Sequence, residues 1–369
     1  MILRALRVRG WRNLAPLTLE PGPRATVLYG QNGQGKSNLL EAVHFVVTFR
    51  SFRTHAQGDL IRWGEKQAAV EAEITTRGVQ RSLRVQIGEG RKVAQLDGKA
   101  VRRDAASLDG AAVVLFGPED LRLPKAAAAE RRRFVDRAVF AGYRPYYREA
   151  LGFEKALKSR NVLLRRGGAS GALLESYDEE LATTGARIVM RRRGLVSALG
   201  ERFAATFQRI HGAPEVSTRY RSEAAVEEAK TEGEVREALR EGLARHRAAD
   251  ERRGFTGFGP QTDDLELLLG AHPAREHGSQ GQLRSLVLAL KIAELEHLRE
   301  TLREPPLLLL DDVASELDGE RRSKLFETIA ALACQTLITV TEREHLPVLR
   351  ERIDYEVAQG DIGVPNVAK

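Results

Sequence analysis

The sequence predicts an α/β protein in which a head domain is assembled from both ends of the chain and a mainly helical second domain is inserted between them. Three observations carry this prediction. Strand patterns dominate residues 1–118, helix formers dominate residues 119–254, and strand patterns return in residues 255–369. A chain of 369 residues is long enough for two domains. We therefore predict a head of residues 1–118 plus 255–369 and an inserted, basic domain of residues 119–254.

The first part of the chain alternates short apolar runs with glycine-containing turns. The predicted strands are residues 2–8, 17–19, 25–29, 70–74, 82–87, 93–96 and 111–116. The run at 25–29 is apolar throughout, which is typical of a strand that is buried on both faces of a sheet. A helix is predicted at 38–49, directly after a glycine-rich loop.

The remainder of the chain shows long helical patterns, followed by strands that alternate with helices. Within the inserted segment, the predicted helices are residues 151–164, 173–211 and 222–253. After it, the predicted strands are residues 265–269, 307–310 and 336–340, and the predicted helices are residues 281–302 and 319–332.

Composition excludes several classes of protein. The only cysteine is Cys334, so the chain can form neither an internal disulfide nor a cysteine-rich zinc site. No apolar run approaches the ~20 residues of a membrane span, and we expect a soluble, cytoplasmic protein without a membrane partner. The net charge of +7 indicates a polyanionic partner or ligand.

The positive charge is concentrated in one segment. Residues 121–212 hold 19 Lys and Arg against 9 Asp and Glu, a local excess of +10, so the rest of the chain sums to −3. Clustered positive charge favours DNA binding, although the same arginines would also suit the solvated faces of helices. The candidate DNA-binding residues are Arg131, Arg132, Arg133, Arg191, Arg192 and Arg193.

Residues 30–37 match G-x-x-x-x-G-K-[ST], a phosphate-binding loop, between a predicted strand and a predicted helix. The glycines let successive N–H groups point at one phosphate, and the helix N-terminus adds partial positive charge. We expect Lys36 to act catalytically on the β- and γ-phosphates and Ser37 to bind Mg²⁺. The candidate nucleotide-binding residues are Gly30, Gln31, Asn32, Gly33, Gln34, Gly35, Lys36, Ser37 and Asn38.

An acidic pair, Asp311-Asp312, follows the four leucines at 307–310. A buried parallel strand would deliver these carboxylates to the edge of the sheet where ligands bind. We expect Asp311 to hold Mg²⁺ together with Ser37, and Asp312 to position or deprotonate the attacking water as the catalytic base.

A third motif lies 32 residues before Asp311, where Ser279, Gln280, Gly281 and Gln282 open a predicted helix. We call these residues the signature segment. The pair Ser279 and Gln282 predicts a capping box. The exposed N–H groups and the hydroxyl of such a helix start would also suit a γ-phosphate.

Together these segments resemble the ABC-type ATPase heads of the SMC family. The resembling segments are residues 11–13, 30–42, 51–54, 116–121, 131–134, 259–260, 263–264, 279–294 and 307–318. The resemblance implies that ATP and Mg²⁺ join two heads into a homodimer. In that dimer the signature segment would act in trans, on nucleotide bound by the other copy, and Ser315 and Asp318 would lie in the loop at the dimer contact.

The resemblance also implies a biological role. It is that of an ATP-dependent clamp on duplex or gapped DNA, without sequence preference, in DNA replication and in the repair of DNA damage. The implied tasks are recombinational repair of single-strand gaps and replication restart within the SOS response, where the protein would help to load RecA with RecR-type partners. The implied enzyme is a weak, DNA-dependent ATPase.

The chain departs at three places from the patterns of ABC-type ATPases and of the family that it resembles. No histidine directly follows the strand at 336–340, and the nearest is His345. Glu119 or Asp120 stands about where ABC-type ATPases carry a Mg²⁺-sensing glutamine. Gln261-Thr262 stands where the family that the chain resembles usually shows His-Arg after Gly-Pro. The missing histidine, together with an aspartate rather than a longer glutamate at 312, predicts slow hydrolysis.

Two other functions remain open on the sequence alone: an ABC-type transport ATPase subunit, or a small-molecule kinase that uses the phosphate-binding loop. The long, basic insertion argues against the transport subunit. The signature segment argues against the kinase. The sequence also leaves open whether Arg12 and Arg53 contact phosphate or pack on the head.

Overall fold

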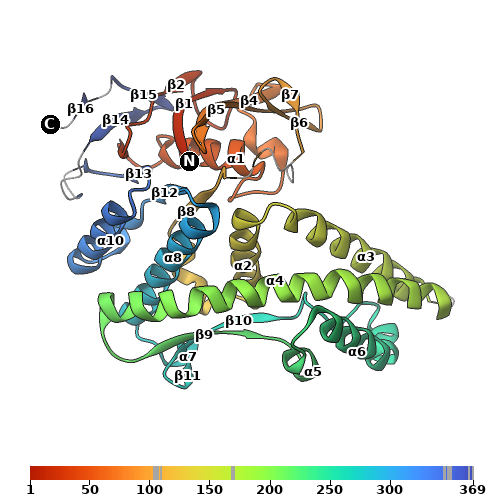
Figure 1. The fold of residues 1–369 in the computed structure, drawn as a ribbon. Helices are drawn as coiled ribbons and strands as arrows, with labels where there is room; N and C mark the ends of the chain where they lie inside the picture. The colour runs from red at the N-terminus through yellow and green to blue at the C-terminus, as the bar shows by residue number, and fades with distance from the viewer. Residues whose placement is uncertain are drawn as a thin grey trace. The chain divides into compact units, whose positions relative to one another are not determined.

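The computed structural model describes residues 1–102, 108, 110–167, 171–343, 346, 351–364, 366 and 367 (Figure 1). It divides into two compact units. The first consists of Met1–Leu121 with Lys291–Lys369, and the second of Arg122–Leu290. The first unit is therefore built from both ends of the chain, as the α/β prediction requires. These units divide the chain after Leu121 and after Leu290. The predicted domain boundaries, at 118/119 and 254/255, stay a prediction.

The first unit contains an antiparallel sheet of six strands in the order β2-β1-β4-β5-β6-β7. Its strands are β1 (Ile2–Arg9), β2 (Leu17–Leu19), β4 (Gln67–Thr76), β5 (Val79–Gly88), β6 (Arg91–Leu96) and β7 (Lys99–Ala100). Burial alternates along β4, where every second residue is buried, as expected for a sheet with one face on the core.

A second, mainly parallel sheet of the first unit carries the order β15-β14-β3-β13-β12-β8, with β16 paired to β14. Its strands are β3 (Ala25–Tyr29), β8 (Val113–Phe116), β12 (Leu307–Asp311), β13 (Thr336–Val340), β14 (Arg352–Ala358), β15 (Asp361–Ile362) and β16 (Asn366–Val367). Asp311 is in register with Thr339, and Tyr29 with Val340. The carboxyl ends of β3, β12 and β13 therefore share one edge, where ligands bind in such sheets.

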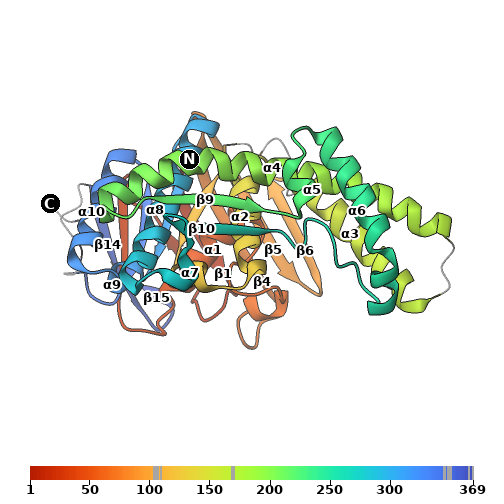
Figure 2. The same ribbon diagram turned by 90° about the horizontal axis from the view of Figure 1, so that it is seen from below.

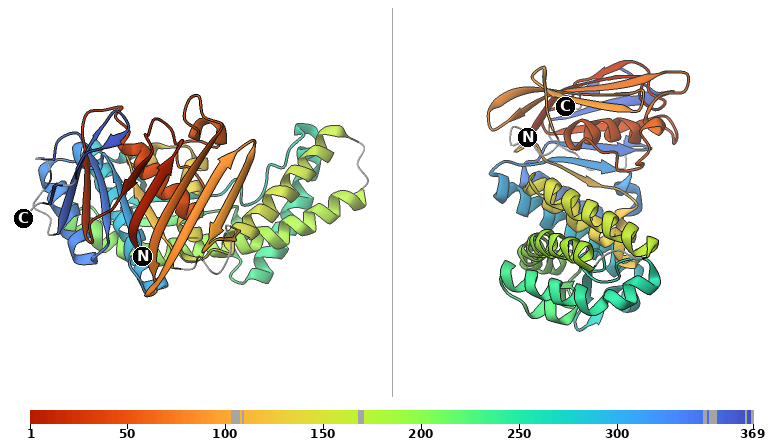
Figure 3. Two further views of the ribbon diagram at one scale, coloured as in Figure 1. Left: turned by 90° about the horizontal axis from the view of Figure 1, so that it is seen from above. Right: turned by 90° about the vertical axis from the view of Figure 1, so that its right-hand side faces the viewer.

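Helix α1 (Lys36–Thr48) lies between these two sheets. The right-hand view of Figure 3 shows it as a separate layer, with the antiparallel sheet on one side and the parallel strands on the other. The helix is buried on almost all sides, so its apolar residues are not confined to one stripe. Leu40, Val43 and Phe45 join Trp11 and Leu28 in the core that holds the two sheets together.

Shorter elements complete the first unit. They are the 3-10 turn Gln57–Leu60 and the helices α9 (Val313–Glu316) and α10 (Gly319–Leu332). The 3-10 turn Asp120–Lys125 and helix α8 (Gln280–Leu302) each contain residues of both units. Within the residues that the structure describes, no helix is long and apolar enough to cross a membrane.

The second unit is mainly helical. Its helices are α2 (Ala128–Gly142), α3 (Tyr146–Arg166), α4 (Gly171–His211), α5 (Ala224–Glu228), α6 (Glu232–Arg253) and α7 (Ala274–His277). A small antiparallel sheet combines β9 (Val216–Arg221), β10 (Asp264–Leu269) and β11 (His272–Pro273) in the order β11-β10-β9. The 41-residue helix α4 packs against α3 and α6, and also against β9 (Figure 2).

Several elements differ from the prediction, among them helix α2, which was not predicted. The single helix at 222–253 is wrong, because Thr231 and Glu234 form a capping box that starts α6 separately from α5. Strand β9 was not predicted, and it pairs with β10 inside the second unit. Strand β14 was also missed, although it extends the parallel sheet beside β3.

Candidate functional site

The phosphate-binding loop joins β3 to α1 and has a backbone shape that depends on its glycines. Gly30 and Gly35 have φ values of +143° and +114°, which L side chains rarely adopt. A Cβ added at Gly30 would lie 2.4 Å from the carbonyl oxygen of Val357. A Cβ added at Gly35 would lie 2.8 Å from the Leu14 side chain. No side chain caps the start of α1, so its first N–H groups are left to serve a phosphate.

Lys36 lies in this loop and is held by the loop itself. Its Nζ donates to the carbonyl oxygens of Gly30 and Gln31, the second at 2.8 Å. Burial lowers the pKa of the Lys36 amine, an effect that the carboxylates of Asp312 and Asp311 oppose. A bound phosphate would replace the loop carbonyls as the partner of this cation.

The other polar residues of the loop fasten it to its neighbours. The Gln34 side chain accepts from the backbone N–H of Gln359 at 2.6 Å. The backbone carbonyl of Gln34 accepts from the N–H of Gly360 at 2.9 Å. The side chain of Asn13 donates to the Gly33 carbonyl at 3.2 Å. Gln31, Asn32 and Gly33 are exposed at the tip of the loop. The turn after β14 therefore supports the loop, which the sequence did not indicate.

The predicted metal ligands meet across a long stretch of chain. The Ser37 hydroxyl donates to Oδ1 of Asp311 at 2.7 Å, although the two residues are 274 positions apart. The Thr339 hydroxyl lies 2.9 Å from the same oxygen. Hydroxyl and carboxylate oxygens are ligands that suit Mg²⁺, so this donor set fits the ion. Mg²⁺ bound here would offset the negative charge of a nucleotide triphosphate.

Asp312 follows in a left-handed backbone conformation, with φ 53° and ψ 21°. Its backbone N–H donates to the Thr339 hydroxyl at 2.9 Å. The Ser315 hydroxyl donates to the carbonyl oxygen of Asp312 at 2.7 Å and lies 3.0 Å from its Oδ1. Partial burial raises the pKa of the Asp312 carboxyl, against the opposing effects of Ser315 and Lys36. Lys36, Ser37, Asp311 and Asp312 thus form one cluster.

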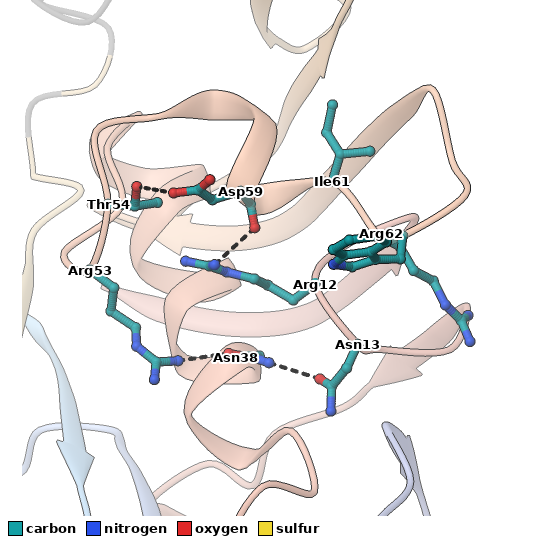
Figure 4. Close-up of a pocket in the computed structure, with 9 residues that line it drawn as sticks. Arg12, Asn13, Asn38, Arg53, Thr54, Asp59, Ile61 and Arg62 are labelled. Carbon is teal, nitrogen blue, oxygen red and sulfur yellow. Dashed lines mark hydrogen bonds between the residues drawn. The ribbon is translucent and has the colours of Figure 1, made fainter.

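A pocket adjoins the phosphate-binding loop (Figure 4). It is lined by Arg12, Asn13, Asn38, Arg53, Thr54, Asp59, Ile61, Arg62 and Trp63. Asn38 donates to the Asn13 side chain at 2.8 Å and accepts from Arg53 at 2.8 Å. Trp63 is fully exposed, although an indole ring is largely apolar. Of these lining residues, the sequence identified Asn38 as a nucleotide contact and left Arg12 and Arg53 open.

The structure gives Arg12 and Arg53 different surroundings. Arg12 makes a two-pronged contact with the buried Glu41 carboxylate, with both distances 2.8 Å, and also donates to the Asp59 carbonyl. Arg12 therefore packs on the head. Arg53 is exposed, and it donates to the side chain of Asn38, which lies directly after the phosphate-binding loop. Its guanidinium is the better placed of the two to meet a nucleotide.

The signature segment lies in the second unit at the start of α8. The predicted capping box is present: Gln282 Oε1 accepts from the Ser279 N–H at 2.9 Å, and the Ser279 hydroxyl accepts from the Gln282 N–H at 3.3 Å. Both bonds are made at an exposed position of the chain. Ser279 and Gln280 are exposed at this helix start.

The structure describes the predicted dimer loop and one of the positions that depart from the ABC pattern, Asp120. Asp318 caps α10 by accepting from the Arg321 N–H at 3.0 Å, and Ser315 and Asp318 are both exposed. Asp120 accepts from the Gly117 N–H at 3.0 Å and lies 3.6 Å from Lys291, so this carboxylate holds the turn after β8. His345 lies outside the described residues.

The candidate DNA-binding arginines at 131–133 have different surroundings. Arg131 is buried, and its Nη2 lies 2.7 Å from an oxygen of Asp264. Arg132 donates to the Asp263 carbonyl at 2.6 Å. Arg133 is exposed. Two of the three side chains therefore serve the second unit internally, and Arg133 is left as the surface candidate.

The second run behaves in the same way. Arg192 is buried, and it donates to Asp136 at 2.7 Å and to the Pro260 carbonyl at 2.7 Å. Arg193 donates to carbonyl oxygens in the segment around α5. Arg191 is exposed, and it lies 4.0 Å from the centre of the Tyr143 ring. DNA binding by the six arginines stays a prediction. Only Arg133 and Arg191 of the six are exposed, so these two are the candidates for contact with DNA.

These features define a class of protein. A phosphate-binding loop between β3 and α1, next to an acidic pair after β12, forms a nucleotide-binding site of the SMC kind, and the chain also carries a serine-capped helix, α8. The comparison with family models agrees, because residues 2–361 match the model described as the RecF/RecN/SMC N terminal domain. The chain belongs to the RecF family of DNA replication and repair proteins.

Similar proteins place the chain within that family. It is 46% identical to the DNA replication and repair protein RecF of Anaeromyxobacter dehalogenans strain 2CP-C over 348 residues, 93% of each protein. It is 42% identical to the protein of the same description from Myxococcus xanthus strain DK1622, over 93% of this chain and 91% of that protein.

Solved structures agree with this placement. One described as the recombination mediator protein RecF-ATPrS in the RecFOR pathway has a TM-score of 0.90 and 30% identity, over 98% of this chain and 97% of that one. A Smc head bound to the C-winged helix domain of ScpA has a TM-score of 0.56 and 18% identity, over 99% of this chain and 97% of that one, which shows a shared fold.

Proposed function

We propose that this RecF-family chain is an ATP-dependent DNA-binding protein of recombinational repair, in which ATP joins two heads on DNA. One observation carries the proposal. The phosphate-binding loop brings Lys36 and Ser37 to the carboxylates of Asp311 and Asp312, with 2.7 Å between the Ser37 hydroxyl and Asp311. Solved relatives described as RecF-ATPrS and RecF-ATP support ATP as the nucleotide.

The residues of the cluster divide the work of binding and hydrolysis. The glycine-shaped loop and the Lys36 cation bind the phosphates, while Ser37 and Asp311 hold Mg²⁺. Asp312 orients the attacking water and accepts its proton. Hydrolysis is weak and depends on DNA, which suits an assembly switch better than a metabolic enzyme.

Dimerisation uses surfaces that the described structure leaves exposed. The N–H and hydroxyl groups of the signature segment lie at the exposed start of α8, where they can meet the γ-phosphate held by a second copy. Ser315 and Asp318 are also exposed, and they lie just after the acidic pair. ATP held between two copies would then be the bond of the homodimer.

DNA binding is assigned to the exposed part of the basic segment. Arg133 and Arg191 are the surface members of the two arginine runs. No motif for reading bases is present in the sequence, so contacts with phosphate should dominate, and the preference should be for DNA shape or junctions. Two joined heads present two such surfaces to one DNA, which raises the apparent affinity through effective concentration.

The family supports a proposal for the cellular setting. The chain would act in the cytoplasm on duplex or gapped DNA after damage, together with a RecR-type mediator that helps to load RecA. The RecFOR pathway named for a solved relative supports the mediator. Membership of the RecF family argues against both the transport subunit and the kinase.

Analytical ultracentrifugation tests this function. Wild-type protein should sediment as a dimer with ATP and as a monomer with ADP or without nucleotide, and gapped DNA should strengthen the dimer. Asp312→Asn should bind ATP and accumulate as a dimer, because the amide cannot accept a proton from water. Wild-type hydrolysis in this variant would move the catalytic role to another residue.

A DNA titration adds the second half of the test. Arg133→Glu should weaken DNA binding in ATP, and the log–log salt slope on duplex should become shallower by about 0.9 for each phosphate that is no longer neutralised. Lys99→Glu, an equal charge reversal at an exposed position of β7 in the first unit, is the control. Equal weakening in both variants would assign the effect to net charge and would contradict a DNA surface at Arg133.

A further inference from the structure

Thr339 lies on the strand between the two strands that lead into the site, and none of the sequence motifs includes it. It belongs to β13, which pairs with β12 on one side and with β3 on the other. Its side chain is fully buried, and its register partner on β12 is Asp311. The strand that carries the acidic pair and the strand that leads into the phosphate-binding loop therefore both flank this one threonine.

The Thr339 hydroxyl contacts both members of the acidic pair. It accepts the backbone N–H of Asp312 at 2.9 Å, and it lies 2.9 Å from Oδ1 of Asp311. A hydroxyl has one proton to donate and two lone pairs that accept, so it can make both bonds at once. The carbonyl oxygen of Leu310 is a more distant alternative acceptor, at 3.5 Å.

Each of these two bonds restrains a different property of the site. The bond from Asp312 fixes the backbone of a residue with φ 53°, a conformation that is uncommon outside glycine and persists only when its surroundings hold it. The bond to Asp311 fixes the rotation of the carboxylate, whose Oδ1 also accepts from Ser37. If Ser37 turns to a metal, Thr339 remains as a donor to that oxygen.

We propose that Thr339 is a positioning residue that holds the Asp311 carboxylate for metal binding and the Asp312 backbone for catalysis. The proposal rests on the proposed function, because it assigns Thr339 no contact of its own with nucleotide or water. It differs from a packing role, since a packing residue would need the shape of threonine and not its hydroxyl.

The same strand supplies a matched control. Thr336 is also buried in β13, but its hydroxyl donates to the Cys334 carbonyl at 3.3 Å. Thr336 is in register with Leu308, three residues before Asp311, and with Ala25. Replacing either threonine by valine removes one buried hydroxyl from β13 and conserves its shape, so the two variants differ in what that hydroxyl contacts.

The test compares Thr339→Val, Thr339→Ser, Thr336→Val and Asp312→Asn in ATP hydrolysis and ATP binding, with a Mg²⁺ titration. Thr339→Val should lose about 10- to 100-fold in kcat and in apparent Mg²⁺ affinity, as for lost support of a metal ligand. Its affinity for ATP without Mg²⁺ should change by less than about 3-fold, because the phosphate-binding loop is intact. Thr339→Ser should restore most of the loss, and Thr336→Val should resemble wild type.

Other outcomes overturn the proposal. Thr339→Val at the wild-type rate, the same loss in Thr336→Val, or no rescue by serine would each return Thr339 to a packing role. If Thr339→Val does not fold, as judged by circular dichroism, Thr339→Ala is the second variant without the hydroxyl, with the same expected losses. Failure of the proposed function is distinct: wild type would not hydrolyse ATP, or Asp312→Asn would hydrolyse it normally.

Discussion

The two aspartates of the nucleotide site in the first unit have different partners from the aspartates inside the second unit. In the second unit, the carboxylates inside the helical region are paired with arginine: Asp178 and Asp250 with Arg160, at 2.6 and 2.8 Å, and Asp136 with Arg192 at 2.7 Å. In the first unit, Asp311 and Asp312 contact hydroxyls from Ser37, Thr339 and Ser315. Among the described residues, no arginine pairs with either of these two.

The difference separates charge that builds the fold from charge that awaits a ligand. The Arg160 guanidinium donates hydrogen bonds directly to Asp178 and Asp250, and these bonds join helices α3, α4 and α6. A hydroxyl orients a carboxylate but leaves its charge in place. Two adjacent carboxylates that share one lysine therefore keep a net charge that a bound cation can neutralise.

The largest expected effect is on the paired side of this comparison. Arg160→Met should lower the free energy of unfolding by about 3–5 kcal/mol, because it leaves Asp178 and Asp250 buried without their cation. Denaturant unfolding measures the loss. Lys158→Met, on the same helix, removes an exposed cation paired with Glu154 and should change stability by no more than ~0.5 kcal/mol.

Equal losses of stability in the two α3 variants would contradict the view that pairing inside the second unit is structural. A marginal loss in Arg160→Met alone would mean that water reaches the two aspartates once the arginine is gone. Either result would remove the contrast with Asp311 and Asp312.

The second prediction concerns the ligand side. At 100 times its Kd, ATP should stabilise the wild-type protein by about 2.7 kcal/mol, and Lys36→Ala should lose most of this gain. The reason is that Lys36 supplies a point charge to phosphates that the loop N–H groups alone hold weakly. Thermal unfolding with and without ATP measures the difference.

Lys66→Ala removes an exposed lysine of the first unit and should keep the full stabilisation. Without nucleotide, Lys36→Ala should change stability by less than about 1 kcal/mol, since no buried ion pair is broken. Full stabilisation of Lys36→Ala by ATP would refute the assignment of the phosphate-binding loop.

The sequence was a good guide where one local stretch of chain contains the whole signal. The phosphate-binding loop needs its glycines, its lysine and its flanking elements within a few residues, and the structure contains all of them. The acidic pair was also visible, because four buried leucines before Asp311 indicate a central strand. The predicted α/β head from both chain ends is confirmed by the sheet that joins β3 and β8 to β12 and β13.

Signals that depend on tertiary pairing were missed. Thr339 looks like an ordinary strand residue, because β-branched side chains favour strands whatever their hydroxyls contact. The two arginine runs share a different limit: neighbouring helical residues point about 100° apart, so three in a row cannot face one surface.

Strand β14 did have a local signal, since Ile353, Tyr355 and Val357 alternate along it with the period of two that is typical of a strand, but the strand was not predicted.

The smallest effect is expected at Ser279, which combines a structural bond with an exposed position. Ser279→Ala should cost about 1 kcal/mol of stability, the usual cost of losing an N-cap. Thr231→Ala, which removes the matching cap of α6, should cost about the same.

The two caps should differ in the dimer. Ser279→Ala should also weaken ATP-driven dimerisation, because its hydroxyl lies at an exposed helix start where a second copy's γ-phosphate would bind, whereas Thr231→Ala should dimerise normally. Ser279→Arg, whose bulk would fill that space, should bind ATP as a monomer. Sedimentation with ATP decides the matter: if Ser279→Arg still dimerises, Ser279 is structural in the same sense as the buried arginines, and the contact with the second copy lies elsewhere.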